Sequence, residues 1–368
     1  MSIDTAPART SRGPVRPAER ALAPDLTRGA MLLIIALANV AGVVFAGEPG
    51  LDATPTGVDR VLNFLLFALV HAHGYPVFAV MFGYGLVQLA RRQDASGATP
   101  RQVRSVLLRR NLWLVAFGFA HAALLYYGDF LGAYGIVGIV MTVLLLRRGA
   151  KLHRTILVLW ALIGVEILIL GAIVISGIAG SRGSAPLPAG HVDSLAASHY
   201  LASVVDRLAE WPTHTLTVVP FIVIAWLGMW AARRRVLEEL AGHRTLLRWT
   251  AAVGLGVATV GGLPAALVSA GWLHVDEPTA SLILMLHGAS GMFAGPGYAA
   301  VFGLIALRVT RPGPVLSALS ALGQRSLSGY LFQSVAWLLL LAPFTLALGQ
   351  RSATPRWRGC SSRSPSGW

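Results

Sequence analysis

Charged residues are scarce in this chain, and their scarcity excludes an ordinary soluble domain. Asp, Glu, Lys and Arg make up 12% of the 368 residues, whereas hydrophobic residues make up 55%. A soluble domain carries about 25% charged residues. Apolar runs such as residues 155–176 reach the length of roughly 20 residues that crosses a bilayer as a helix. The runs are continuous rather than alternating, so the expected fold class is all-α, a polytopic transmembrane helical bundle.

Motifs that carry known chemistry are few as well. Cys360 is the single cysteine, so the chain cannot form an internal disulfide. The sequence has no phosphate-binding loop, no paired cysteines and no His-x-x-x-His spacing, and it therefore predicts no metal site. Any cofactor stays unknown at this level.

Lysine is nearly absent, with Lys151 alone, so the net charge of +14 comes from arginine. The arginines cluster in every second gap between apolar runs, within residues 9–28, 91–110, 147–154, 233–248 and 308–325. The other gaps carry most of the acidic residues. This alternation follows the positive-inside rule and predicts a cytoplasmic N-terminus. It excludes nucleic acid as a partner, because the basic residues do not form one continuous face, and it indicates the lipid bilayer instead.

The apolar runs predict about nine spanning helices. We expect them at residues 29–47, 74–90, 106–127, 130–146, 155–177, 214–232, 249–272, 280–307 and 328–348. Residues 61–73 are an extra outer-leaflet or re-entrant segment, or the first part of a long tilted helix. An external loop after residue 177 is expected to contain an amphipathic helix near residues 193–210.

Several short motifs, in a fixed order, carry a family resemblance. They lie at residues 25–39 (DLTRGAMLLIIALAN), 78–86 (FAVMFGYGL), 118–140 (GFAHAALLYYGDFLGAYGIVGIV), 295–303 and 323–334 (GQRSLSGYLFQS). In these segments the chain resembles the YeiB-like family of uncharacterised bacterial membrane proteins, domain of unknown function 418. That family is distantly related to membrane acyltransferases. The resemblance implies a multi-pass protein of the bacterial cell (inner) membrane.

The resemblance divides the chain into three parts. Residues 1–22 are an expected disordered basic cytoplasmic tail, and residues 23–349 the YeiB-like transmembrane domain. Residues 350–368 are a polar tail rich in Arg and Ser, where the family normally has a further helix. This tail comes either from a reading frame lost near residue 350 or from a genuine, divergent end.

His121 and Asp129 are the candidate catalytic residues. They lie toward the outer end of one expected helix and in the turn that follows it. If both were helical, eight residues would separate them by roughly 12 Å, so a direct pair requires the turn at Gly128 to fold Asp129 back. Asp129 would then orient His121 as a general base. The alternative is a helix-packing histidine and an aspartate that caps the next helix.

Arg28 and Asn39 are candidate substrate-binding residues. Eleven helical steps of about 100° place the two on nearly the same face of one helix. The spacing resembles that of an arginine and a catalytic histidine in membrane acyltransferases, although Asn39 cannot act as a base. The alternative is a membrane anchor and an interhelical hydrogen bond of about 0.6 to 2 kcal/mol. His73 joins this candidate set from the outer side, or is an interfacial residue, and the last motif adds Tyr330 and Gln333.

Glu166 is the candidate ion or proton site, because it interrupts the apolar run at residues 155–177. The alternative is a neutral carboxyl, or one hydrogen-bonded to a neighbouring helix.

Two functions follow from these candidate residues. One is a membrane-embedded transferase that moves an acyl group to a small-molecule or envelope acceptor. The other is a transporter or lipid-handling protein without covalent chemistry.

Overall fold

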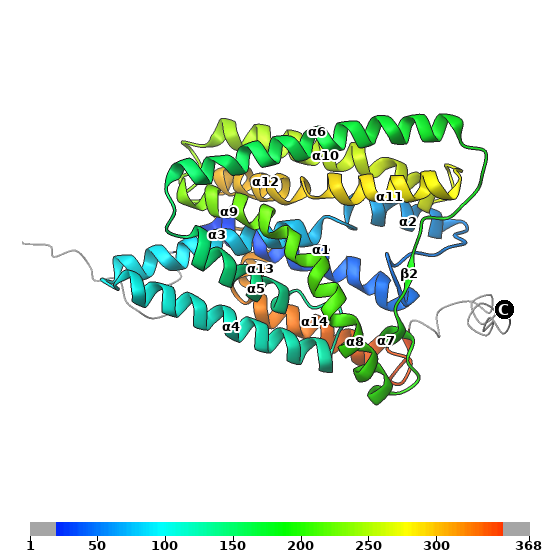
Figure 1. Cartoon of the computed structure of the whole chain (residues 1–368), viewed down its shortest axis with the longest axis horizontal. Coiled ribbons are helices and arrows are strands. Elements are labelled where there is room, and N and C mark those ends of the chain that lie inside the picture. Colours follow the sequence, from blue (N-terminus) through cyan, green and yellow to red (C-terminus); the bar gives the residue numbers. More distant parts are fainter. Residues whose placement is uncertain (1–19, 349–368) are drawn as a thin grey trace, which may run out of the picture.

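The helices of this protein run along one long axis, with the chain connections gathered at the two ends (Figure 1). The computed structural model describes residues 20–348, which form helices and a single two-stranded ribbon. The expected all-α helical bundle is therefore confirmed. The expected tails, residues 1–22 and 350–368, lie outside the described residues apart from residues 20–22.

The first six helices are α1 (Leu22–Phe45), α2 (Val58–Leu69), α3 (Gly74–Ala95), α4 (Pro100–Leu124), α5 (Leu131–Val140) and α6 (Ala150–Gly180). The others are α7 (Asp193–Ala196), α8 (Tyr200–Val218), α9 (Ile222–Arg233), α10 (Arg244–Ser269), α11 (Glu277–Gly291), α12 (Ala294–Arg308), α13 (Pro314–Gln324) and α14 (Ser326–Leu341). A π-helical turn (Met141–Leu145) follows α5, and a 3₁₀ turn (Val219–Phe221) joins α8 to α9. Strand β1 (Gly47–Glu48) pairs antiparallel with β2 (Gly190–His191).

Six helical stretches within residues 20–348 are long and apolar enough to cross a bilayer. They are Leu22–Phe45, Val58–Ala95, Ala150–Gly180, Tyr200–Arg233, Arg244–Ser269 and Glu277–Arg308, and two shorter apolar helices cover Leu131–Leu145 and Ser326–Leu341. These helices are those of a membrane protein. The total of about nine spans stays a prediction.

Several expected boundaries are wrong. The amphipathic helix near residues 193–210 does not stop before Pro212, because α8 continues through this proline to Val218. The helix expected at 280–307 is divided into α11 and α12 by a turn at Met292 and Phe293. Helix α13 was not expected. Residues 58–69 form a separate helix, α2, before the turn that leads into α3.

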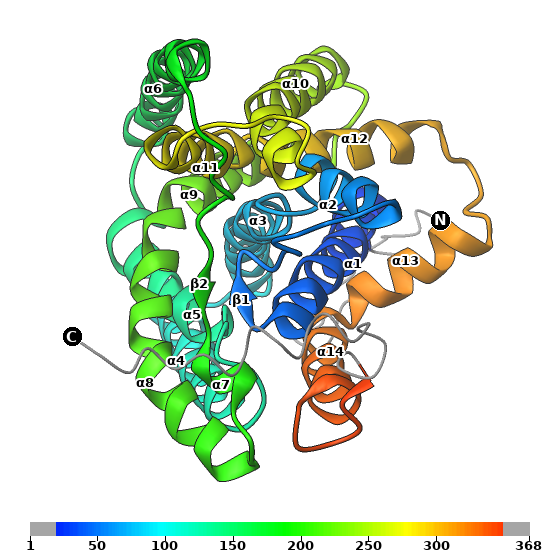
Figure 2. The same cartoon turned by 90° about the vertical axis from the view of Figure 1, so that its right-hand side faces the viewer.

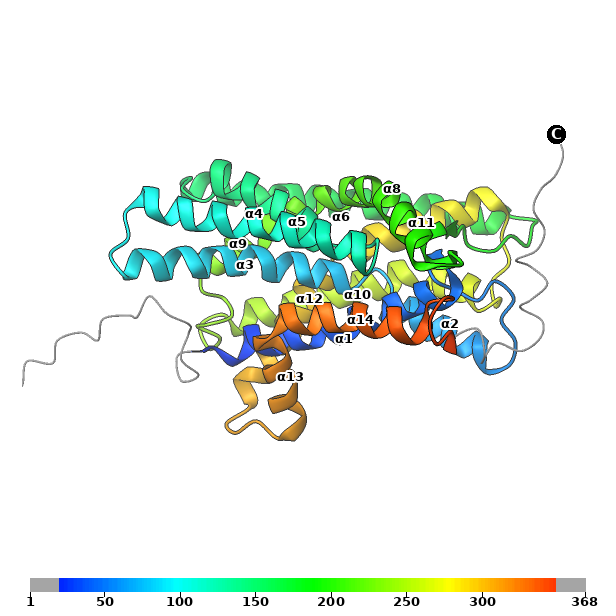
Figure 3. The ribbon, with the colours of Figure 1, turned by 90° about the horizontal axis from the view of Figure 1, so that it is seen from below.

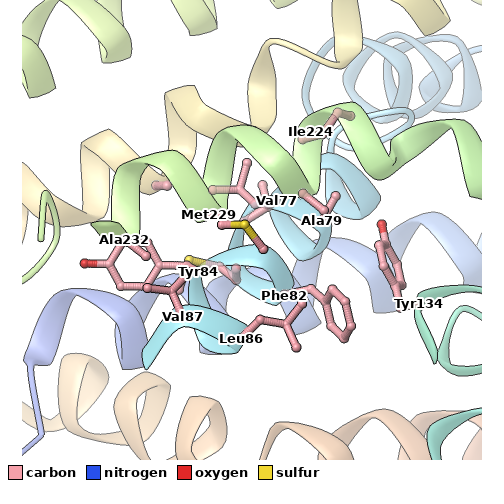
Figure 4. Packing of buried hydrophobic residues seen from close by; sticks show 14 of the residues in the cluster. Val77, Ala79, Phe82, Tyr84, Leu86, Val87, Tyr134, Ile224, Met229 and Ala232 are labelled. Carbon is pink, nitrogen blue, oxygen red and sulfur yellow. The ribbon is translucent and has the colours of Figure 1, made fainter. Parts of the chain in front are cut away.

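Helix α3 lies at the centre of the bundle and packs against α1, α4, α5, α9 and α12. Tyr84, Leu86 and Met229 are among the largest fully buried side chains of this core (Figure 4). In lipid, such contacts stabilise the bundle through close packing rather than through removal of apolar surface from water. Gly83 of α3 permits the closest of these contacts, since a side chain there would overlap the Ala225 carbonyl of α9.

Three connections that contain arginines or are flanked by them lie together at one end of the bundle (Figure 3). Arg147 Nη2 lies 2.9 Å from Asp94 Oδ1, which joins the α3–α4 turn to the turn before α6. Arg233 donates hydrogen bonds of 3.2 Å to the carbonyls of Leu146 and Arg148. We call this the arginine end, comprising residues 94–100, 146–150 and 233–244.

The opposite end gathers the connections that carry acidic residues. The pairing of β1 with β2 joins the segment after α1 to the segment after α6. The backbone N–H of Asp276 donates a 2.6 Å hydrogen bond to Ser181 Oγ, which joins the α10–α11 turn to the same segment. We call this the acidic end, comprising residues 46–57, 181–193 and 270–276.

Candidate functional site

A buried row of three side chains connects α4, the turn after it and α14. His121 Nδ1 lies 3.0 Å from Asp129 Oδ1, a close ion-pair distance without straight hydrogen-bond geometry. On the other side of the ring, His121 Nε2 lies 2.8 Å from Ser334 Oγ. All three residues are buried, with exposed fractions of 3%, 0% and 1% for His121, Asp129 and Ser334. A carboxylate, an imidazole and a hydroxyl therefore stand in line.

The turn after α4 makes this pairing possible. Helix α4 ends at Leu124, and residues 125–130 fold back, so that Asp129 Oδ2 accepts a 2.7 Å hydrogen bond from Gly132 N at the start of α5. Gly118 of α4 faces this turn, and a side chain there would overlap both Asp129 Oδ2 and Gly132 N. The close approach of α4 and α5 thus holds the carboxylate beside the imidazole. Asp129 is both a helix cap and the partner of His121.

Tyr330 and Gln333 of α14 lie beside this row. The Tyr330 ring lies 5.0 Å from the His121 ring, and its hydroxyl accepts a 3.2 Å hydrogen bond from Phe130 N. Gln333 Nε2 donates a 2.9 Å hydrogen bond to the Leu32 carbonyl of α1, and its Oε1 is buried without a hydrogen-bond partner. Tyr330 therefore touches the site, whereas Gln333 anchors α14 on α1.

A large cavity opens on the arginine side of these residues. Its volume is about 800 Å³. Six arginines line it (Arg20, Arg28, Arg91, Arg92, Arg110 and Arg235), against the acidic residues Asp25 and Glu238. Arg28 lies 3.6 Å from Asp25 and donates a 3.4 Å hydrogen bond to Gln88. Arginines therefore outnumber acidic residues in the lining, which gives this cavity a positive potential. We call it the arginine cavity.

An apolar cavity continues from the arginine cavity toward the buried row. Its volume is about 540 Å³, and Phe78, Phe82, Arg110 and Ser326 line both cavities. Trp113, Phe117 and Tyr134 line its further part, and Tyr330 stands at its wall. We call it the aromatic cavity. Ser326, Tyr330 and Ser334 recur every four residues along α14, so they share one face at intervals of about 6 Å. The row of side chains thus lies one turn beyond the aromatic cavity.

Two other predicted residues lie apart from this row and from both cavities. Asn39 is half-buried, with an Nδ2 that has no hydrogen-bond partner, and it lines neither cavity. His73 is buried beside His287, and His287 Nε2 lies 2.9 Å from His71 Nδ1.

Among residues 20–348, no group of three or more ligating side chains is arranged to hold a metal ion.

Glu166 also lies apart. Its side chain is exposed on the outer surface of α6, and it lines neither the arginine cavity nor the aromatic cavity. The role of Glu166 as an ion or proton site stays a prediction, now at an exposed position of α6.

At the acidic end, Tyr127 covers the outer side of the candidate site. Its hydroxyl donates a 2.9 Å hydrogen bond to Glu48 Oε2, and its ring packs edge-on against His214 of α8. Burial raises the pKa of Tyr127 well above its usual value, so the phenol remains a neutral donor. The side chain holds the segment after α1 against α8.

Sequence reasoning missed Ser334 and Arg110. Ser334 ends the motif at residues 323–334, and its place four residues after Tyr330 is a signal that it shares the Tyr330 face. Arg110 was assigned to a topology cluster, yet it sits ten residues into α4, where it lines both cavities and lies 5.5 Å from the Phe82 ring centroid. A cation so far from its helix end is a signal of function rather than of topology.

Comparison with protein families confirms the resemblance to domain of unknown function 418. Residues 231–360 match the family described as "Protein of unknown function (DUF418)". This match does not extend to a relationship with acyltransferases.

Two curated relatives are themselves uncharacterised. The chain is 34% identical over 117 residues to an uncharacterised 39.9 kDa protein in the amylase 3' region of Bacillus acidopullulyticus. The aligned segment covers 32% of this chain and 32% of the relative. The chain is also 26% identical over 294 residues to the uncharacterised protein YxaH of Bacillus subtilis (strain 168). This alignment covers 74% of the chain and 67% of the relative. The first match thus spans about a third of its relative's length. No solved structure matches this chain.

Proposed function

We propose that this chain, a DUF418 protein by the match of residues 231–360, is a membrane-embedded acyltransferase. It takes an acyl group from an anionic donor at the arginine end and passes it to a cell-envelope acceptor. The observation that carries the proposal is the row of Asp129, His121 and Ser334 one helical turn beyond two connected cavities. In the same proposal, the protein resides in the bacterial inner membrane.

The cavities fit an acyl donor because their chemistry changes along their length. Arg28 and Arg110 offer cationic contacts to the charged carrier of the donor. The aromatic cavity offers Phe117 and Tyr134 to the less polar arm that joins the charged carrier to a short acyl group. An acyl carbonyl that passes Tyr330 arrives at Ser334. The donor would thus span the two cavities with its reactive end toward the buried row.

Acyl transfer then takes two steps. His121 Nε2 accepts the proton of Ser334 as Oγ bonds to the acyl carbon, and the protonated imidazole returns this proton to the departing carrier. An acceptor hydroxyl or amine next attacks the acyl-Ser334 carbonyl and gives its proton to His121. The bond between the acyl carbon and Ser334 Oγ then breaks, and His121 returns the proton to Oγ. Asp129 orients the imidazole and stabilises its charged form in both steps. The Tyr330 hydroxyl, which accepts from Phe130 N, is left to donate its proton to the carbonyl oxygen.

The transport alternative has less support. A transporter would need an ionisable group in a cavity at the middle of the membrane that opens to both sides. The candidate for that group, Glu166, instead faces outward from α6. The two connected cavities lead from the cluster of arginines to Tyr330, one helical turn from the buried Ser–His–Asp row, and this arrangement favours chemistry over passage.

The test is a search for the acyl-enzyme on the full chain. Purified protein in lipid vesicles is incubated with radiolabelled acetyl-CoA, and separately with a medium-chain acyl-CoA, and the label is located by peptide mass spectrometry. We expect the label on Ser334 and its loss in Ser334→Ala. Ser328→Ala, which changes an exposed serine of the same helix, is the matched control.

Two results would overturn the proposal. One is label retained in Ser334→Ala at the level of the control. The other is absence of any labelled peptide together with an unchanged envelope in a deletion strain, as judged by untargeted lipid and glycan profiling. A deletion strain whose envelope lacks acyl groups on a glycan or lipid identifies the acceptor.

A further inference from the structure

A third cavity lies on the opposite face of α3 from the proposed acyl path. Its volume is about 330 Å³, within the range of small-ligand sites. The floor includes Tyr84 of α3, Trp230 of α9 and Ala299 of α12. Apart from Thr250, the polar atoms of its side chains belong to tyrosine and tryptophan, and the Tyr84 hydroxyl already accepts a hydrogen bond from Leu237 N. The interior therefore suits an apolar chain. We call it the lateral cavity.

The mouth of the lateral cavity lies between α6 and α10. Leu157 of α6 forms one wall, and Trp249 and Val253 of α10 form the other. These three side chains are 41%, 68% and 49% exposed. Helix α6 stands at the edge of the bundle, separated from α10 in the end-on view (Figure 2). Both helices are membrane-spanning candidates, so the mouth faces lipid rather than water.

Basic side chains flank the end of this mouth that is nearest the arginine end. The Arg234 guanidinium lies 5.4 Å from the ring centroid of Trp230, a lining residue. Arg154 precedes Leu157 by one turn of α6, and His243 precedes Leu246 by the same interval at the start of α10. Helices α9 and α6 thus bring one arginine each, and α10 a histidine, to the depth where phospholipid headgroups lie.

We propose that the lateral cavity binds one acyl chain of an anionic phospholipid from the leaflet at the arginine end, with the headgroup at Arg234 and Arg154. A soluble ligand would have to enter through the bilayer, because the mouth opens between two spanning helices. A second copy of this chain is disfavoured as an occupant, since it would bring the same cations of both rims together. The bound lipid fills the gap between α6 and α10 and is independent of acyl transfer.

The test measures which lipids stay with the full chain. The protein is reconstituted in vesicles of phosphatidylcholine with phosphatidylglycerol, and retained lipids are counted by native mass spectrometry. We expect phosphatidylglycerol to be retained in preference to phosphatidylcholine. Val253→Phe narrows the mouth and should remove most of the retained lipid. Val260→Phe is its matched control, seven residues along the same exposed face of α10.

The headgroup contact has its own pair of variants. Arg234→Gln should lower phosphatidylglycerol retention about fivefold, which corresponds to about 1 kcal/mol for one cation near a membrane surface. Arg248→Gln removes an exposed arginine of α10 and should leave retention unchanged. Equal retention of the two lipids by the unaltered chain would overturn the proposal. So would equal retention by Val253→Phe and Val260→Phe.

Discussion

Two contacts and the burial of the residues that make them give Ser334 its candidate role as a nucleophile. Its hydroxyl faces His121 Nε2, the opposite ring nitrogen faces Asp129, and all three side chains are buried. Removing one partner of a buried polar contact costs about 1–3 kcal/mol or more, because the other group is left without its partner. A test of chemistry at this site therefore needs substitutions that keep volume and hydrogen bonding.

Asp129→Asn is such a substitution. The amide keeps the size of the carboxyl and can still accept from Gly132 N, but it cannot stabilise a protonated His121. We expect acyl transfer from acyl-CoA to slow by about 10²–10⁴-fold, with only a small change in the unfolding temperature. Asp59→Asn, at an exposed position of α2, is the control. A normal transfer rate in a folded Asp129→Asn protein would leave Asp129 as a helix cap only.

Arg110 provides a second prediction, at the opening between the cavities. Arg110→Gln should weaken binding of an acyl-CoA about tenfold or more, since one charge-assisted contact contributes about 1.5–3 kcal/mol. The measurement is the KM for acyl-CoA, or its Kd, at two salt concentrations. Arg104→Gln removes an exposed charge from the same helix and should change neither value. Equal effects of the two substitutions would mean that Arg110 acts only through general surface charge.

At the residue scale, the sequence could predict a pair but not a triad. His121 and Asp129 are eight residues apart, and the glycine-containing turn between them made a direct contact a concrete hypothesis. Ser334 lies 213 residues from His121. Its approach depends on how α14 packs against α4, which spacing along the chain does not determine. The cavities could not be predicted for the same reason.

Among the elements, α3 and α9 form the closest pair in the core. A side chain at Gly83 would overlap the Ala225 carbonyl, and one at Gly228 would overlap the Val80 carbonyl. We expect Gly83→Ala to separate the two helices and to lower the free energy of unfolding by about 1–3 kcal/mol. Gly256→Ala is the control, because a methyl group there meets no atom within 4 Å. Thermal unfolding in detergent compares the two, and equal midpoints would contradict the close contact.

Hydropathy predicted where helices exist better than where they end. The expected helices near residues 193–210 and at residues 214–232 leave a break between them, yet α8 continues through Pro212 to Val218. The turn between α11 and α12 lies among glycines and other small residues at 288–297 (GASGMFAGPG), which hydropathy averaged over a long window does not separate from a continuous helix. The N–H of Phe293 donates a 3.0 Å hydrogen bond to the Ser290 carbonyl in this turn. Local backbone hydrogen bonds of this kind leave no trace in composition.

For the whole molecule, two independent observations agree on which connections share a side. The arginine distribution predicts the sides from charge alone. In the structure, hydrogen bonds and ion pairs group the same connections at the arginine end and at the acidic end. The polar contacts between connections were not used to predict the sides. Their agreement supports one orientation for the whole bundle.

Reporter fusions can test this orientation directly. Fusions after Ser96, Gly149 and Gly242, all at the arginine end, should report the cytoplasm. Fusions in the acidic-end connections, at residues 53, 184 and 276, should report the outside. The physical reason is that short loops rich in arginine resist transfer across the membrane. One reproducible inversion at residue 149 or 184 would contradict the orientation. It would also place the arginine cavity on the side that a cytoplasmic acyl donor cannot reach, so the proposed direction of acyl transfer depends on this result.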